Sequence, residues 1–185
     1  MKNQRAIWIT QTGIFLAILI VAQIVTKSIP IPPPFHTVIP GTVNNMLFIL
    51  AVMLCGISSA AVLAVVSPCL ATLLGIGPIW PFVPVIVAGN IVLVVLWYLI
   101  ALRHEQPGKL RMGIALVSSA AVKFLVLFIG IINLLAPLIL GISVAQAKIA
   151  FIAFFWPQLI TAAVGGIIAI LIYPQLKKAL PKIRT

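Results

Sequence analysis

Residues able to do acid–base, nucleophilic or metal chemistry are nearly absent from this sequence. It contains one carboxylate side chain, Glu105, and two imidazoles, His36 and His104. Acid–base and nucleophilic catalysis need partner groups in hydrogen-bond contact, and metal sites need several clustered ligands. No such set can be assembled from these residues. The sequence therefore predicts a binding or channel-like protein rather than an enzyme, with no metal or cofactor of its own.

A second group of polar residues interrupts long apolar runs. It consists of five amides, which are Asn44, Asn45, Asn90, Asn133 and Gln158. In the spans assigned below, all five fall in the outer half of a membrane. Hydrogen bonds between helices are a common role for such amides, whereas their matching depth favours a polar pocket that opens outwards. Both interpretations remain open from the sequence.

Lys123 is the polar residue whose burial would cost the most free energy, since it lies near the middle of an apolar run. Burying an ammonium group in a membrane is costly unless the group is paired, and no acidic residue lies in any apolar run. Lys123 can snorkel towards an interface, bond to helix carbonyls, or meet an anionic group on a ligand.

Three aromatic residues complete the candidate site, and all three are predicted near the outer face. An aromatic belt explains the tryptophans, and an interfacial position explains the histidine. The alternative is that the tryptophans stack on a bound ring and that the histidine contacts the ligand, or its metal, through a neutral imidazole. The candidate substrate-binding residues are therefore His36, Asn44, Asn45, Trp80, Asn90, Lys123, Asn133, Trp156 and Gln158.

The composition predicts that a membrane bundle positions these residues. Of the 185 residues, 63% are hydrophobic and 7% are charged, and the mean hydropathy is +1.31. So little charge cannot cover a soluble surface. At about 20 residues per crossing, the chain allows roughly five to seven spans. We therefore expect an all-α, multi-pass domain over residues 1–185 in the cell membrane, and no disulfide between Cys55 and Cys69, which both lie in apolar runs.

Proline, glycine and charge clusters divide the chain into six predicted spans. These are residues 7–27, 42–57, 58–76, 85–102, 112–136 and 148–173. The outer loops are then 28–41, 77–84 and 137–147, and a tight turn at 56–58 joins the second and third spans. The five prolines of the first loop argue against helix there.

The basic residues predict the orientation of the bundle. The chain has twelve Lys and Arg, and nine of them lie on the side of the two termini: Lys2, Arg5, Arg103, Lys109, Arg111, Lys177, Lys178, Lys182 and Arg184. The positive-inside rule then makes both termini cytoplasmic. Because these charges flank apolar runs, the net charge of +11 does not indicate nucleic-acid binding.

Small residues form two faces suited to close helix contacts. Gly13 and Ala17 are four residues apart on the first span, and Gly165, Gly166 and Ala169 lie on the sixth. Packing within the bundle explains both faces, and docking of a partner subunit is the alternative.

The whole chain resembles the substrate-binding S components of energy-coupling factor (ECF) vitamin transporters. The resemblance rests on the six-span pattern and on TGIFLAILI, TVNNMLFILAVMLCGISSA, SPCLATLLGIGP and PVIVAGNIVLVVLW. The motifs are diffuse, and the Ala-xxx-Ala docking motif of the family is here Gly13-xxx-Ala17. The resemblance implies that the chain binds a vitamin at the outer face and docks on a membrane coupling subunit with two cytoplasmic ATPases. ATP hydrolysis would then belong to those partners, and this chain has no P-loop.

The substrate is less well indicated than the family. The amides suit an amide-rich ligand such as cobalamin, whose phosphodiester could meet Lys123 and whose cobalt could meet His36. Pantothenate is the main rival, because its carboxylate could also meet Lys123. Outside this class, a structural or assembly subunit without a ligand remains open, and a small membrane enzyme is disfavoured.

Overall fold

A computed structural model of the chain describes residues 2–29, 35–75, 77–103, 108–135 and 156–179. These residues form six long helices, with no strand among them. The helices are α1 (Lys2–Ser28), α2 (Phe35–Cys55), α3 (Ile57–Leu73), α4 (Val83–Trp97), α5 (Lys109–Ile129) and α8 (Trp156–Ala179). A 3-10 turn (Trp80–Phe82) precedes α4, and π-helical segments extend α4 (Tyr98–Leu102) and α5 (Gly130–Leu135). The predicted all-α fold is confirmed.

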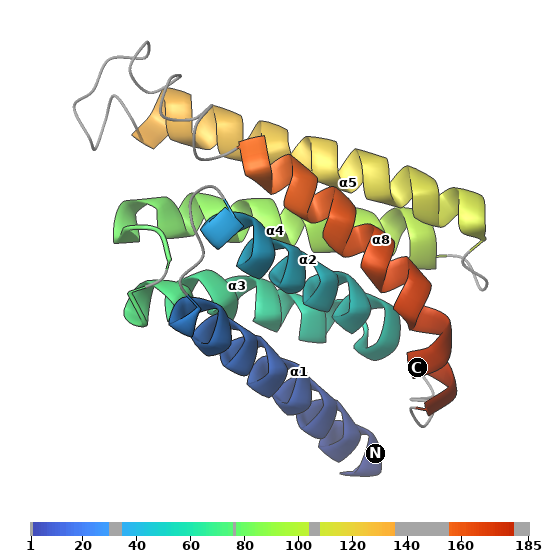
Figure 1. The fold of residues 1–185 in the computed structure, drawn as a ribbon. Coiled ribbons are helices and arrows are strands. Elements are labelled where there is room, and N and C mark those ends of the chain that lie inside the picture. The colour runs from blue at the N-terminus through green and yellow to red at the C-terminus, as the bar shows by residue number, and fades with distance from the viewer. Residues whose placement is uncertain (1, 30–34, 76, 104–107, 136–155, 180–185) are drawn as a thin grey trace.

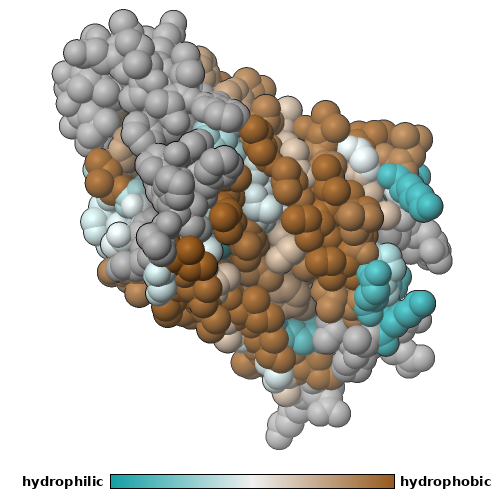
Figure 2. Space-filling model, viewed as in Figure 1, coloured by the Kyte–Doolittle hydropathy of each residue, from teal (hydrophilic) through white to brown (hydrophobic). Residues whose placement is uncertain are grey.

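The helices have the length and composition of membrane spans. Five of them are long and apolar enough to cross a membrane, and α3 is a shorter apolar helix of 17 residues. At 1.5 Å per residue, α3 is about 26 Å long, close to the thickness of a bilayer's hydrocarbon core. Figure 2 shows a broad apolar surface on the face in view, with the most hydrophilic side chains gathered towards one end.

Two predicted connections are partly helical, so their boundaries were wrong. Helix α2 begins at Phe35 and includes Pro40, although residues 28–41 were expected to form a loop. A proline so near the start of a helix removes few intrahelical hydrogen bonds, and membrane helices tolerate it. Residues Trp80–Phe82 and the start of α4 at Val83 likewise fall in the predicted loop 77–84. The predicted loop 137–147 and the start of the sixth span at 148–155 lie outside the described residues.

The turn between α2 and α3 was predicted correctly. Gly56 alone separates Cys55 from Ile57, with a φ of 89°. This left-handed conformation suits glycine, since a Cβ would be strained there. Helix α8 continues to Ala179, past Pro174, so it is longer at its end than the predicted sixth span.

Successive helices run in opposite directions, and α1 begins at the end of the bundle where α8 stops (Figure 1). Exposed basic side chains belong to the helix termini at this end, which we call the basic end: Arg5, Arg103, Lys109, Arg111, Lys177 and Lys178. That the basic end faces the cytoplasm stays a prediction from the positive-inside rule.

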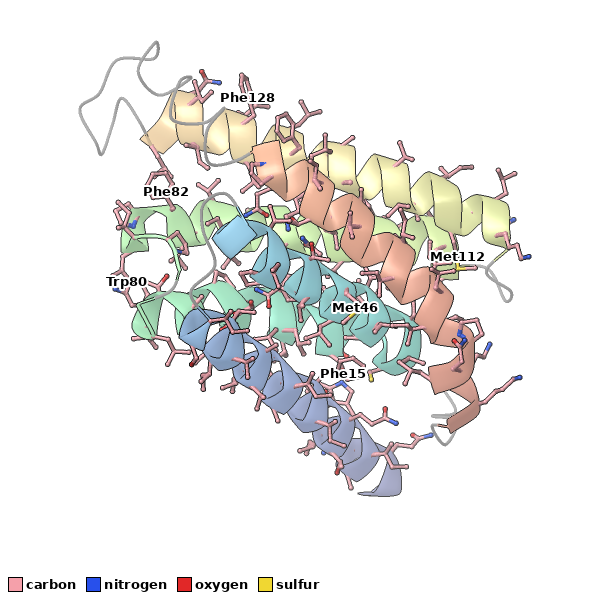
Figure 3. The ribbon with its side chains drawn as sticks, viewed as in Figure 1. Phe15, Met46, Trp80, Phe82, Met112 and Phe128 are labelled. Carbon is pink, nitrogen blue, oxygen red and sulfur yellow. The ribbon has the colours of Figure 1, made fainter. Side chains whose placement is uncertain are left out.

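Helix α2 lies at the centre of the bundle, in contact with α1, α3, α4 and α8. Its residues 47–53 are all buried, from 0 to 8% exposed, so this stretch is covered on every side. Its most extensive contact is with α8. By contrast, α1 packs on α2 and α3 through Phe15 and Leu19 (Phe15 is labelled in Figure 3) and exposes its opposite face.

Candidate polar site in the bundle

The centre of the candidate site is a hydrogen bond between α5 and α2. The Nζ of Lys123 donates to Oδ1 of Asn45 over 2.7 Å. Lys123 is 2% exposed and Asn45 is 1% exposed, so an ammonium group and an amide meet inside an apolar bundle. The acceptor for Lys123 is thus a neutral side chain. The described residues show neither a bond of Nζ to a helix carbonyl nor an extension of the side chain to the surface.

Asn45 also ties the site to α8. Its Nδ2 donates to Oγ1 of Thr161 over 3.1 Å and to the backbone oxygen of Gly41 over 2.9 Å. Thr161, 1% exposed, donates in turn to the backbone oxygen of Gln158. These three hydrogen bonds fix the orientation of the Asn45 side chain. They therefore also fix the position of Oδ1, which accepts from Lys123. We call Lys123, Asn45 and Thr161 the polar triad.

Glycines let the helices approach closely around the polar triad. A Cβ on Gly89 of α4 would meet Cγ of Lys123 at 3.5 Å and the side chain of Leu127 at 3.3 Å. A Cβ on Gly41 would meet the side chain of Thr161 at 3.0 Å. The lysine stem therefore packs against the backbone of α4, and Thr161 packs against that of α2.

Replacing Asn45 with alanine should destabilise the protein because the Lys123 ammonium would lose its acceptor while staying buried. Hydrogen bonds to charged groups contribute about 1.5–3 kcal/mol, and Thr161 would lose a partner as well. We expect a loss of about 2–3 kcal/mol, measured by thermal unfolding in detergent.

Asn90→Ala is the matched control for Asn45→Ala. Asn90 is also buried, but its Nδ2 makes a neutral bond of 3.3 Å to the backbone oxygen of Ala64 on α3. A neutral hydrogen bond contributes about 1 kcal/mol. Equal losses in the two variants would mean that the charge of Lys123 does not bear on the polar triad.

The other predicted site residues are placed differently. Gln158 is half-buried in the first described turn of α8, and the residues before Trp156, from which its depth was predicted, lie outside the described part of the chain. Asn44 is half-buried, and its Oδ1 is enclosed with no partner. Trp80 is 54% exposed at the end of the bundle where α4 begins (Figure 3), and Asn133 is exposed on the π-helical extension of α5. The side chains of His36 and Trp156 lie outside what the structure describes.

Sequence reasoning missed a second buried polar contact, between α1 and α3. The Nε2 of Gln23, a residue 1% exposed, donates to Oγ of Ser67 over 3.0 Å, and its Oε1 is buried without a partner. Nearer the basic end, Thr12 and Ser59 share a hydrogen bond of 2.8 Å, and Trp8 donates to Ser58. Gln23 could have been identified as a polar residue within an apolar run. Thr161, Ser59 and Ser67 could not, because serine and threonine are common in membrane helices.

The predicted docking residues are on the exposed face of α1. Gly13 and Ala17 are both exposed, and a Cβ on Gly13 would meet nothing within 4 Å. Their neighbours on this face are large and apolar, since Ile14, Ile18 and Val21 are 48–59% exposed. We call this surface the α1 face. Gly165 and Gly166, in contrast, are buried against other helices of the same chain.

The part of the chain that the structure describes contains no cluster of three or more His, Cys or acidic side chains that could hold a metal ion. The arrangement can therefore bind polar groups within an apolar bundle, through a cation, amides and a hydroxyl, and it offers no set of catalytic groups among those residues.

Comparison with known proteins gives one match. Neither the curated proteins nor the solved structures yield a significant similarity. The profile of the family described as "ECF transporter, substrate-specific component" matches residues 8–176, which include α2, α3, α4 and α5 completely and most of α1 and α8. The buried polar groups, the apolar helices and this match lead to one conclusion: the chain belongs to the ECF transporter substrate-specific component family, the S components, and is a multi-pass membrane protein.

Proposed function

We propose that this S component captures a vitamin, cobalamin being the best candidate, at the end of the bundle opposite the basic end. It would then deliver the vitamin through an ATP-driven module made of a membrane coupling subunit and two cytoplasmic ATPases. The observation that carries the proposal is the polar triad. An ionisable side chain buried within a membrane bundle is expensive, and such residues mark substrate or ion pathways.

The position of the polar triad supports capture at that end. Thr161 is the sixth residue of α8, which begins at Trp156 at the end opposite the basic end. The other two helices place the polar triad deeper, since Asn45 lies ten residues from Phe35 and Lys123 twelve from Leu135, which correspond to about 15 Å and 18 Å. A ligand that enters from that end would meet the three hydrogen-bonded side chains together.

Amide chemistry favours cobalamin. Its side chains carry amides, which complement the free Oδ1 of Asn44 and the amides of Asn90 and Gln158. Its phosphodiester is an anion for Lys123. Pantothenate, with one amide and one carboxylate, is the alternative substrate of the same site.

The α1 face is proposed to dock the coupling subunit. Small residues let a second helix approach the backbone closely within a membrane, where packing rather than the hydrophobic effect drives association. Gly13 and Ala17 provide such a surface on a helix whose face is open, and the apolar neighbours make it compatible with a position within the bilayer.

Purification followed by mass spectrometry tests the substrate. We expect cobalamin to co-purify with the detergent-solubilised chain, and the emptied chain to bind cobalamin at least ten-fold more tightly than pantothenate in equilibrium titrations.

Two results would contradict these expectations in different ways. Tighter binding of pantothenate would overturn the choice of cobalamin and leave the capture of a vitamin standing. If no vitamin co-purified and none of a panel bound, the chain would instead be an assembly subunit without a ligand.

A further inference from the structure

The ammonium group of Lys123 uses one of its three hydrogen-bond donors. Its acceptor is Oδ1 of Asn45 at 2.7 Å, and the structure shows no other partner for it among the described residues. An ammonium group has three N–H donors and no acceptor. Two donors on a side chain that is 2% exposed therefore have no partner among the described residues.

Lys123 cannot satisfy those donors by reaching water at either end of its helix. It lies 14 residues after Lys109, where α5 starts, and 12 residues before Leu135, where the π-helical extension stops. At 1.5 Å per residue these separations are about 21 Å and 18 Å. Both are far longer than a lysine side chain, which excludes the snorkelling open to lysines near helix ends.

The described residues place no acidic side chain against Lys123. The sequence holds one acidic residue, Glu105, and it precedes α5 in the chain. The one group shown in contact with Nζ is the neutral amide of Asn45; Thr161 is bonded to that amide, and Gly89 lies against the lysine stem at Cγ. Burying a charge costs free energy, and an opposite charge at hydrogen-bond distance offsets part of that cost. When Lys123 is protonated, the polar triad therefore carries one positive charge without a negative partner.

We infer that the solute captured by this chain carries a single negative charge, as a carboxylate or a phosphodiester, which binds Nζ of Lys123. This inference rests on the proposed function and adds the chemical class of the group that is recognised. Asn45 is the positioning residue, because its own hydrogen bonds to Thr161 and Gly41 fix the side chain that holds Nζ.

The single charge of the Lys123 ammonium also limits which anionic groups the solute can carry. One ammonium balances one negative charge, so a phosphomonoester, with a charge near −1.5 to −2 at pH 7, would leave an excess in the bundle. A cationic solute would add a second uncompensated charge. Carboxylates and phosphodiesters are the groups whose charge and oxygen acceptors both match the two free donors.

Matched pairs of solutes test this inference. Each pair differs in the anionic group, as in pantothenate and pantothenol, or nicotinate and nicotinamide. We expect the purified chain to bind the anionic member of one pair at least ten-fold more tightly than its neutral partner. Lys123→Met should abolish that preference, and Lys123→Arg should keep most of it.

Lys177→Met is the control, since it removes an exposed positive charge at the basic end and should leave the preference unchanged. Equal binding of both members of every pair by the unmodified chain would overturn the inference without using any variant. So would a preference that survives in a Lys123→Met protein that runs as a single species in size-exclusion chromatography.

The remaining outcomes separate this inference from its alternatives. If no solute binds at all, the proposed function fails and the anion site fails with it, whereas binding without charge preference overturns the anion site alone. A lipid phosphate could also supply the negative charge. If Lys123→Met removed a tightly co-purifying anionic lipid and left solute binding unchanged, the anion would be a headgroup and the solute inference would be wrong.

Discussion

Replacing Gly165 with alanine should cause the largest loss of stability of any single methyl group added to α8. A Cβ at this position would lie 2.6 Å from the backbone oxygen of Thr42 and 2.9 Å from the backbone nitrogen of Met46. These atoms belong to helix α2, so the clash can be relieved only by moving two helices apart. Overpacking of this kind costs typically 1–3 kcal/mol, and we expect a value of about 3 kcal/mol. In thermal unfolding this corresponds to roughly 6–12 °C for a chain of this length.

The adjacent glycine provides the matched control. A Cβ on Gly166 would also meet a close neighbour, but this neighbour is the terminal Cδ1 of Leu116, and a leucine side chain can change rotamer. We expect Gly166→Ala to cost less than 1 kcal/mol, given that alanine is also the better helix former. Equal losses in the two variants would contradict the close backbone packing of α2 on α8.

Gly13→Leu should abolish vitamin uptake by the assembled transporter and leave vitamin binding intact. Nothing lies within 4 Å of a Cβ at Gly13, so the isolated chain can accept a larger side chain there without rearrangement. A helix of the coupling subunit that packs against the α1 face would be pushed away by the leucine, because close helix contacts in membranes depend on small residues. We expect uptake of the labelled vitamin to fall at least ten-fold, with an unchanged dissociation constant for the purified chain.

The control for Gly13→Leu is Gly113→Leu. Gly113 lies on α5, and a Cβ there also meets nothing within 4 Å. The same substitution on a helix not proposed to dock should leave uptake near the level of the unmodified chain. Loss of vitamin binding in Gly13→Leu, with coupling retained, would show that the α1 face belongs to the binding site instead.

The composition and the positions of glycine, proline and charged residues predicted most of the fold. The six long helices among the described residues, their order and the turn at Gly56 follow from apolar runs broken by glycine, proline and charge, because backbone groups in lipid must be satisfied within a helix. The errors lie where proline was given too much weight. Pro40 and Pro174 both lie inside helices, since a membrane helix accepts the loss of a hydrogen bond that a soluble helix would not.

The candidate site was predicted only in part. An amide or a lysine in an apolar run is visible in the sequence, so Asn45, Asn90 and Lys123 were identified. Their partners were not, because the contact of Lys123 with Asn45 depends on which faces of α5 and α2 meet. The five amides were predicted to lie at matching depths. They do not form one cluster in the structure, since Asn133 is exposed and Asn90 bonds to α3.

The contact between α2 and α8 has a consequence for biosynthesis. Asn45 and Thr161 are 116 residues apart in the chain, and Asn45 and Lys123 are 78 apart. At about 5–20 residues per second, the ribosome makes Thr161 some 6–23 s after Asn45. Throughout that interval the central helix lacks the neighbour with which it makes its most extensive contact. Until α8 is inserted, the Asn45 amide keeps only its bond to Gly41 within α2 and its bond to Lys123, so the polar triad can form only after α8 has entered the membrane.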